Sequence, residues 1–198
     1  MPDDLDHAKK ALRAEIREQR QRTTDPWREN ASEGIRVQLD ALVSELGAGS
    51  LSCYLSAPAE PGTRPFLDAA LARGIRVLLP ITRADGLLDW TVAEPGGAEI
   101  DSAYGIPEAV GEVLGPIAVN DVDLLIVPAS AVDRDGMRMG WGRGFYDKTL
   151  GSMAHRPPVF AVIYDSELVD RVPRDLHDQP VDGVVTPTRT VRFAGRRD

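Results

Sequence analysis

Short apolar runs of the length of buried strands recur along this chain and alternate with segments of helical periodicity. Residues 124–127 read Leu-Leu-Ile-Val without a polar side chain, which is typical of a strand covered on both faces. Strands that alternate with helices predict an α/β fold, a three-layer domain with a mostly parallel central sheet. Further strands are expected at residues 51–56, 75–80, 88–93, 159–164 and 181–186, and helices at residues 26–46, 64–73 and 145–150.

The length of the chain limits its organisation. A chain of 198 residues predicts a single domain, 1–198, that is large enough to bury a substantial core. Residues 1–22 are expected to form an N-terminal basic amphipathic helix, because apolar side chains recur on one stripe between charged faces. Residues 94–120 are rich in Gly and Pro without clear periodicity, so we expect a long excursion from the sheet. Residues 189–198 are polar and are expected to fray.

The charge and the cysteine content exclude several classes of protein. A net charge of −8 argues against a general nucleic-acid binder, because phosphate backbones attract basic surfaces. A single cysteine, Cys53, excludes an intramolecular disulfide and fits a reducing compartment. No apolar stretch has the length of a membrane span, and the N-terminus lacks the pattern of a signal peptide. We therefore expect a cytoplasmic protein whose partners are small molecules, without nucleic-acid or membrane partners. A monomer is the expected state, which neither the charge nor the cysteine content determines.

A glycine-rich segment, residues 136–148, follows the strand expected at residues 124–127. Gly140, Gly142 and Gly144 alternate with other residues, and without Cβ atoms they can take positive φ and let a bound group approach the backbone. Exposed N–H groups there, together with the start of the following helix, would form a cradle for an anion. The spacing of the glycines matches neither the P-loop nor the dinucleotide-binding fingerprint.

Charged side chains in the same segment indicate what the anion would be. Arg138, Arg143 and Lys148 supply positive charge, whereas Asp147 is a carboxylate. A carboxylate beside a phosphate site usually means that a divalent cation lies between them. The alternative is a loop that only turns the chain, but such a turn needs neither the cations nor Asp147. The segment therefore predicts a site for a nucleotide polyphosphate and its metal ion.

Two acidic residues that follow other predicted strands could belong to the same site. Glu60 is either a solvated loop residue or a carboxylate that hydrogen-bonds a ligand ring rich in amide or amine groups. Asp178 follows His177 and, with Asp147, could complete a cation site built from oxygen atoms. The histidines lack the spacing of zinc ligands. Because ligands gather at the carboxyl ends of parallel strands, we expect one shared site.

The N-terminal helix carries a cluster of cations near its start. Lys9, Lys10 and Arg13 are either a solvated helix face or ligands for the phosphates. Neighbouring side chains on a helix point about 100° apart. One of the two lysines is therefore expected to point away from the site, and the sequence leaves open which one.

The order of these motifs resembles the 5-formyltetrahydrofolate cyclo-ligase family, also called methenyltetrahydrofolate synthetase, over nearly the whole chain. The strongest match is residues 138–147, which are similar to the family's Arg-Leu-Gly-x-Gly-x-Gly-Tyr-Tyr-Asp. The resemblance implies a Rossmann-like α/β fold of the NagB/RpiA/CoA-transferase type. Other matching segments are residues 9–13, residues 55–60 with Thr63, residues 104–108 and residues 176–178.

The resemblance implies an ATP- and Mg²⁺-dependent cyclo-ligase. It would cyclise 5-formyltetrahydrofolate to 5,10-methenyltetrahydrofolate with release of ADP and phosphate, after phosphorylation of the formyl oxygen. Arg138, Arg143 and Asp147 are expected to be catalytic, and Lys10 and Arg13 to reach the phosphates from the first helix. The expected ATP-binding residues are Lys9, Lys10, Arg13, Arg138, Gly140, Trp141, Gly142, Arg143, Gly144, Phe145 and Tyr146, the expected substrate-binding residues are Leu55, Glu60, Trp141 and Phe145, and the expected metal ligands are Asp147 and Asp178.

Three positions differ from the family pattern. Phe145 replaces the first tyrosine of the usual pair, Lys148 stands where arginine is common, and Glu167 stands where glutamine is frequent. These differences concern substrate contacts more than the nucleotide site, so one alternative is a relative on the same scaffold that acts on another small molecule. The other is a non-catalytic module that binds a nucleotide or sugar phosphate, although it leaves Asp147 and Asp178 without a role.

Overall fold

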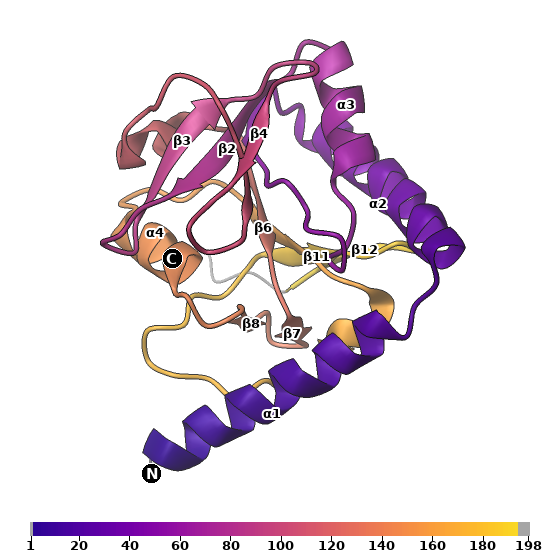
Figure 1. Ribbon diagram of the computed structural model, residues 1–198, viewed down its shortest axis with the longest axis vertical. Helices are drawn as coiled ribbons and strands as arrows, with labels where there is room; N and C mark the ends of the chain where they lie inside the picture. Colours follow the sequence, from indigo (N-terminus) through magenta and orange to yellow (C-terminus); the bar gives the residue numbers. More distant parts are fainter. Residues whose placement is uncertain (1, 194–198) are drawn as a thin grey trace.

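The computed structural model describes residues 2–193 and has a mixed α/β architecture (Figure 1). The central sheet has seven strands, in the spatial order β12 (Thr190–Arg192), β11 (Gly183–Val185), β9 (Val159–Val162), β6 (Leu124–Pro128), β1 (Ser50–Ser52), β2 (Arg76–Thr82) and β3 (Leu88–Val92). The four inner pairs are parallel, whereas the edge pairs β2–β3 and β11–β12 are antiparallel. The predicted α/β class with a mostly parallel sheet is therefore confirmed.

Helices cover both faces of this sheet. In Figure 1, α2 (Asp25–Leu46) and α3 (Arg64–Ala72) lie together on one side and α4 (Phe145–Ser152) lies on the other. Successive side chains of a strand point to opposite faces, so Leu124 packs in the core under α2 and α3, whereas Leu125 packs in the core under α4. The result is an arrangement of three layers. Among residues 2–193, no helix combines the length and the apolar character that a membrane span needs.

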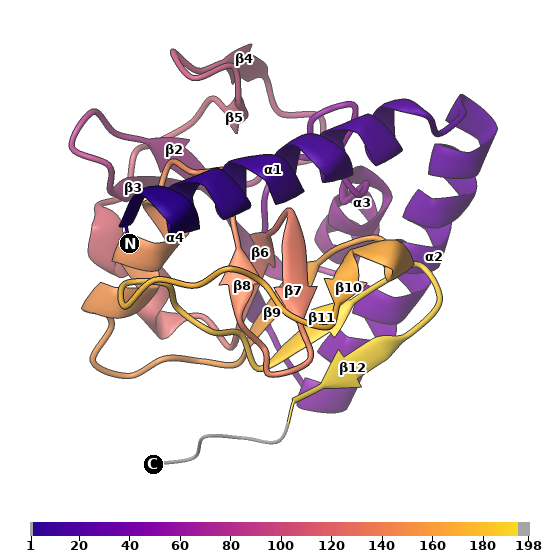
Figure 2. The same cartoon turned by 90° about the horizontal axis from the view of Figure 1, so that it is seen from below.

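The first helix, α1 (Pro2–Gln21), lies across a small second sheet (Figure 2). Ile16 of this helix is buried in a cluster with Ala131 and Met139 of the small sheet. The small sheet begins directly after the carboxyl end of β6. Because α1 packs against this sheet, it lies at the carboxyl end of the central sheet. The small sheet has the order β10 (Leu168–Val169), β7 (Ala131–Asp133) and β8 (Arg138–Met139).

The excursion predicted at residues 94–120 contains ordered elements. Arg64 of α3 donates to both carboxylate oxygens of Glu99, at 2.6 and 2.8 Å. Glu108 is buried and accepts from the backbone N–H and the hydroxyl of Thr82, at 2.8 and 2.5 Å. These contacts tie the excursion to α3 and to β2. Its elements are an antiparallel hairpin of β4 (Glu99–Asp101) and β5 (Pro107–Ala109), followed by the 3-10 helix η1 (Pro116–Asp121).

The prediction that the chain frays from residue 189 is wrong for the part that forms β12. This strand pairs with β11, with Val191 opposite Val184, and Val191 also packs against the core under α4. The polar composition misled the prediction, because backbone pairing at a sheet edge satisfies N–H and C=O groups whatever the side chains are. The remaining part of that tail, residues 194–198, lies outside the described residues.

Candidate active site

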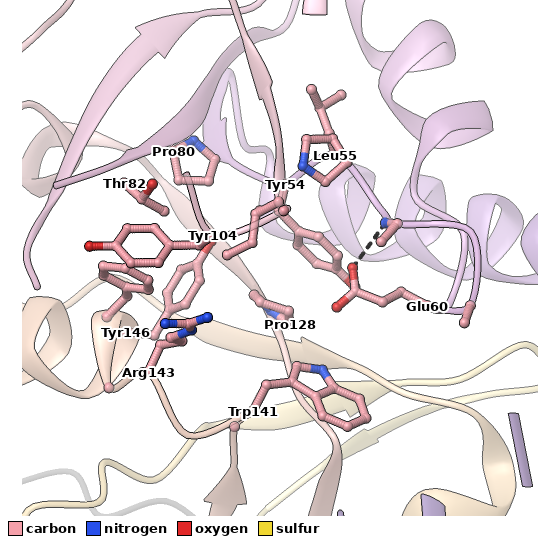
Figure 3. Close-up of a pocket in the computed structure, with 18 of the residues that line it drawn as sticks. Tyr54, Leu55, Glu60, Pro80, Thr82, Tyr104, Pro128, Trp141, Arg143 and Tyr146 are labelled. Atoms are coloured by element: carbon pink, nitrogen blue, oxygen red, sulfur yellow. Dashed lines mark hydrogen bonds between the residues drawn. The ribbon is translucent and has the colours of Figure 1, made fainter. Parts of the chain in front are cut away.

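A cavity lies at the carboxyl edge of the central sheet, where the strand order reverses. From β1 the chain continues to β2 and β3 on one side, and from β6 to β9 and β11 on the other. In open α/β sheets, ligands bind in the crevice at such a switch point. A cavity of about 510 Å³ opens there, and its wall includes Glu60 after β1 and Trp141 after β6 (Figure 3). This volume is within the range of small-molecule sites.

The segment after β1 supplies one wall of the cavity. β1 ends at Ser52, earlier than the predicted end at residue 56, and the next residues are buried without belonging to a strand. The hydroxyl of Thr63 donates to the carbonyl oxygen of Tyr54 at 2.6 Å and holds this irregular stretch against α3. Tyr54 and Leu55 therefore line the cavity.

The glycine segment supplies the opposite wall. Gly142 has φ +93° and Gly144, the residue before α4, has φ +72°. Gly140 does not take positive φ, contrary to the expectation for this residue. A glycine is needed at this position because a side chain has no room there. A Cβ would lie 2.8 Å from Nη1 of Arg138. A Cβ on Gly142 would lie 3.3 Å from Cζ of Arg13, so guanidinium groups approach the loop backbone at both positions.

The first helix brings one of its three predicted cations to this loop and a second to Asp178. Nε of Arg13 donates to the carbonyl oxygen of Gly140 at 2.8 Å. Nζ of Lys9 lies 2.5 Å from Oδ2 of Asp178, and the lysine is buried. Lys10 is exposed, in keeping with the angle between neighbouring helix positions. The packing of α1 thus directs Lys9, and not Lys10, toward the candidate site.

Arg138 and Asp147 form an ion pair in the cavity wall. Nη2 of Arg138 donates to Oδ1 of Asp147 at 2.6 Å, and Nη1 donates to the carbonyl oxygen of Pro128 at 3.3 Å. Only 3% of the arginine is exposed. The side chain of Arg143, in contrast, is exposed, with its guanidinium 4.7 Å from the ring centre of Tyr104. Of the two predicted catalytic arginines, Arg143 therefore has the more accessible charge.

The two predicted metal ligands are brought toward each other. The backbone N–H of Gln179, the residue after Asp178, donates to Oδ1 of Asp147 at 3.2 Å. The described residues contain no group of three or more acidic, histidine or cysteine side chains that could hold a metal ion by themselves. Mg²⁺ commonly binds through one or two carboxylates together with substrate phosphates. Asp147 and Asp178 fit such a partial site, because both supply carboxylate oxygen atoms and Asp147 lies in the first turn of the helix that the glycine segment opens.

Glu60 is held in the wall by its own loop. Its carboxylate accepts the backbone N–H of Ala57 at 3.0 Å, and its carbonyl oxygen accepts the hydroxyl of Tyr164 at 3.2 Å. Burial raises the pKa of the Glu60 carboxyl, and the Ala57 N–H and the charge of Arg20 oppose this shift. Figure 3 shows the carboxylate and the indole of Trp141 at the same side of the cavity. Glu60 is thus a fixed acceptor and not a solvated loop residue.

Aromatic side chains line the remaining wall and carry polar atoms without partners. The rings of Tyr104 and Phe145 pack edge to face, with centroids 5.4 Å apart. Among the described residues, the hydroxyls of Tyr54 and Tyr146 are buried without a hydrogen-bond partner. Buried polar groups in native proteins usually have one, so these atoms are suited to a polar ligand. The predictions missed Tyr54, because they placed it inside the strand expected at residues 51–56, whereas β1 ends at Ser52.

A buried ion pair was also missed by the sequence-based prediction. Arg20 and Glu167 are both buried, and Nε of the arginine lies 2.6 Å from Oε1 of the glutamate. Arg20 lines the cavity, although the sequence analysis did not single it out from the charged faces of the helix. No local signal distinguishes it from the exposed Arg17 of the same helix or from the exposed Arg22 directly after it.

The central sheet is mostly parallel, and a cavity lies at its switch point beside a glycine loop that opens a helix. These features define a class of α/β proteins that bind small molecules at the carboxyl edge of the sheet. The model of the 5-formyltetrahydrofolate cyclo-ligase family matches residues 6–187. The chain therefore belongs to the 5-formyltetrahydrofolate cyclo-ligase family, a family of ligase enzymes.

Individual relatives agree with this assignment over most of the chain. A 5-formyltetrahydrofolate cyclo-ligase of Mycolicibacterium smegmatis is 34% identical over 189 residues, which is 93% of this chain and 96% of that protein. The Escherichia coli protein of the same name is 28% identical, over 88% of this chain and 97% of its own length. An NMR structure of Aquifex aeolicus 5,10-methenyltetrahydrofolate synthetase superimposes with a TM-score of 0.79 at 27% identity and covers 96% of this chain and 95% of its own.

Proposed function

We propose that this chain cyclises 5-formyltetrahydrofolate to 5,10-methenyltetrahydrofolate, using ATP and Mg²⁺ and releasing ADP and phosphate. The observation that carries the proposal is that one cavity has in its wall both the fixed carboxylate of Glu60 and the glycine segment with Arg138 and Arg143. Ring closure driven by ATP needs both substrates held against each other, because positioning supplies much of the rate. The shared wall allows this, and the names of the relatives support the choice of substrate.

The formyl group must be activated, because an amide oxygen is a poor leaving group. In the proposed reaction the formyl oxygen attacks the γ-phosphorus of ATP, a P–O bond forms and ADP leaves. The neighbouring N10 amine then adds to the formyl carbon. The C–O bond breaks, phosphate departs with the oxygen and the N10 proton is released, which leaves the cationic methenyl bridge. Phosphoryl transfer of this kind depends mainly on positioning and on neutralisation of charge.

The phosphates are assigned to the glycine segment and the helix that it opens. Backbone N–H groups near Gly142 and Gly144 and the start of α4 favour an anion, because the first N–H groups of a helix lack partners within it. Arg13 brings positive charge from α1 to the same segment, and Lys9 brings positive charge to Asp178. Arg143 adds an exposed guanidinium from the loop itself. These groups together would neutralise the charge that develops during transfer.

Asp147 and Asp178 are the residues that would hold Mg²⁺. When bound, Mg²⁺ neutralises phosphate charge in the manner of other phosphoryl-transfer enzymes. The pairing of Asp147 with Arg138, and of Asp178 with Lys9, puts a cation beside each carboxylate. Arg138 is therefore assigned to the orientation of Asp147 and the loop in addition to its predicted catalytic role.

The folate is assigned to the wall around Glu60. An ionised carboxylate accepts two N–H groups and fits the amino and amide edge of a pteridine ring. Leu55, Trp141 and Phe145 line the cavity with apolar surface for the faces of the ring. Burial raises the pKa of the Tyr146 hydroxyl, so it stays neutral and can donate a hydrogen bond to the ligand.

The test is the absorbance of the methenyl product with purified protein, Mg²⁺, ATP and 5-formyltetrahydrofolate. Growth of this band that requires both ATP and Mg²⁺ supports the proposal. If this absorbance band does not increase although ATP binds, the result favours the alternative of a relative that acts on another small molecule. ATP binding without any substrate-dependent release of phosphate favours a non-catalytic module. We further propose that the enzyme is a cytoplasmic monomer, which size-exclusion chromatography and cell fractionation would test.

A further inference from the structure

Arg20, in the last turn of α1, is a buried cation in the cavity wall. Its exposed fraction is 3% and that of Glu167 is 2%. Nε and Nη2 donate to the two carboxylate oxygens of Glu167 at 2.6 and 2.9 Å, and Nη2 also donates to the carbonyl oxygen of Ala129 at 3.1 Å. A bidentate pair of this kind holds the guanidinium in one plane and orientation.

The surroundings restrict this guanidinium further. Its carbon lies 5.0 Å from the ring centre of Trp141 and 5.6 Å from that of Tyr164. Oε2 of Glu167 also accepts the backbone N–H of Tyr164 at 2.8 Å, which fixes the carboxylate. Buried ion pairs contribute little net stability, because removing both charges from water is costly. A role in ligand binding explains this arrangement better than stability does.

One nitrogen of Arg20 has no acceptor. Among the described residues, Nη1 is buried without a hydrogen-bond partner, although the other two guanidinium nitrogens are satisfied. A buried donor without a partner is unfavourable, and more so when it is charged. Because Arg20 lines the cavity, a ligand there can supply the missing acceptor.

Glu60 lines the same cavity and lies close enough to Arg20 for the arginine charge to lower the pKa of its carboxyl, against the effect of burial. A carboxylate accepts hydrogen bonds, whereas a guanidinium only donates them. The two groups together complement a planar ring edge on which donors stand beside an acceptor. A 2-amino-4-oxo pteridine has this edge, because its amine and N3–H groups stand beside the oxygen at C4.

We propose that Arg20 is a further substrate-binding residue that donates from Nη1 to the 4-oxo oxygen of the pteridine, with Glu167 as its positioning residue. The inference rests on the proposed function and deepens its folate half. Glu60 accepts hydrogen bonds from the donors of the ring edge, and Arg20 donates a hydrogen bond to its acceptor. The pair discriminates against a 4-amino ring, which would present a donor to a group that is unable to accept one.

The variants are chosen so that folding is preserved. Arg20→Met alone would leave Glu167 buried without its cation, so it is combined with Glu167→Gln, which keeps an acceptor for the Tyr164 N–H. Glu167→Gln alone is the reference for this double variant. Arg22→Met removes an exposed cation directly after the same helix and is the control for net charge. Thermal unfolding of each variant verifies that the fold is intact.

The first measurement is the Kd of 5-formyltetrahydrofolate, from tryptophan fluorescence without ATP. The double variant is expected to bind about tenfold to a hundredfold more weakly than Glu167→Gln, in line with the loss of one charge-assisted hydrogen bond. The KM for ATP and the behaviour of Arg22→Met are expected to stay unchanged. The same Kd in the double variant and in Glu167→Gln would overturn the role of Arg20. A Kd of Glu167→Gln equal to that of the unaltered protein would overturn the positioning role of Glu167.

The second measurement compares 4-oxo and 4-amino forms of the ring. The unaltered protein is expected to prefer the 4-oxo form, and the double variant to lose about tenfold of that preference through weaker 4-oxo binding. An equal loss of affinity for both forms would overturn the proposal, because general damage to the cavity has that effect. Failure of the unaltered protein to bind 5-formyltetrahydrofolate would overturn the proposed function itself, which is a different outcome from normal binding that is insensitive to Arg20.

Discussion

Arg138 donates from Nη2 to Oδ1 of Asp147 across 2.6 Å, and the same oxygen accepts the backbone N–H of Gln179 at 3.2 Å. Arg138 begins β8, Asp147 lies in the first turn of α4, and Gln179 belongs to the segment before β11. One carboxylate therefore joins three parts of the chain beside the glycine loop. Since Arg138 also reaches the carbonyl oxygen of Pro128, the pair sets how α4 starts relative to the end of β6.

Asp147→Asn is expected to lower kcat by about a hundredfold at ordinary magnesium concentrations. The amide keeps the size of the side chain but is a poor ligand for a hard divalent cation and carries no charge to offset it. The methenyl absorbance is followed across a magnesium titration, and the half-saturating concentration should rise. Asp135→Asn, in an exposed turn, is the matched control. Turnover that stays normal without extra magnesium would remove Asp147 from the metal site.

Glu60→Gln is expected to raise the KM for 5-formyltetrahydrofolate by about tenfold to a hundredfold, because a neutral amide replaces a charged acceptor. The KM for ATP should change little, since the phosphates are assigned to the glycine segment. Steady-state kinetics with each substrate varied in turn separate the two effects. Glu94→Gln, which alters an exposed glutamate, serves as the control. An unchanged folate KM would show that the carboxylate does not bind the ring.

The KM for 5-formyltetrahydrofolate is expected to rise as the pH falls. The rise should begin at a higher pH than it would if the pKa of Glu60 were that of an ordinary glutamate. Burial raises the pKa of Glu60, so the carboxyl takes up its proton at a higher pH than usual and the ionised acceptor is lost there. The ionised form, and with it tight binding, is present above this raised pKa and disappears as the pH falls through it. The measurement is the folate KM against pH in the unaltered protein and in Glu60→Gln. The acidic rise should be absent from the variant, and its persistence would assign it to another group.

Lys9→Met is expected to raise the KM for ATP by about tenfold, whereas Lys10→Met is expected to leave it within about twofold. Both changes remove one positive charge from neighbouring positions of α1, so net charge is matched. Only Lys9 is buried and lies against Asp178. ATP kinetics and thermal unfolding are measured together, because loss of Lys9 also leaves Asp178 without its cation. Equal effects of the two substitutions would mean that the orientation of α1 does not select the phosphate ligand.

Gly142→Ala is expected to weaken ATP binding and to lower the free energy of unfolding by about 1–3 kcal/mol. The residue has φ +93°, where a Cβ is strained, and that Cβ would lie 3.3 Å from Cζ of Arg13. Gly96→Ala is a matched control, because Gly96 has φ +67° with open space around a Cβ and does not line the cavity. We expect the two variants to lose comparable free energies of unfolding. Only Gly142→Ala is expected to change the affinity for ATP. The same ATP affinity in both variants would contradict a close approach of phosphate to the loop.

The layers of the fold were predictable because their signals are local. The apolar run at residues 124–127 becomes β6, since a strand covered on both faces has no place for polar side chains. Where strands end was less predictable. β1 ends at Ser52 and β12 forms within a polar tail, because pairing with a neighbouring strand decides both limits. Such pairing joins segments far apart in the chain and leaves no mark on the composition of either one.

The candidate site was predictable in its residue types but not in its pairs. Glycines, cations and one carboxylate stood out by density in one segment, and the strand ends indicated where Glu60 would lie. Arg20 was not singled out, because an amphipathic pattern marks a cation only as part of a charged face. Its partner Glu167 is 147 positions away, so the ion pair has no signature in either local sequence.

By itself, the sequence determined the alternation of strands and helices, the strand that leads into a glycine loop, and the membership of a family. These depend on steric preferences and on the periodic burial of neighbouring residues, which short stretches encode. Only the tertiary structure decided that Lys9 faces the site and Lys10 does not, that Arg138 is bound to Asp147, and that Arg20 is buried. These outcomes depend on how α1 packs on the second sheet, a contact between residues more than a hundred positions apart that no local preference specifies.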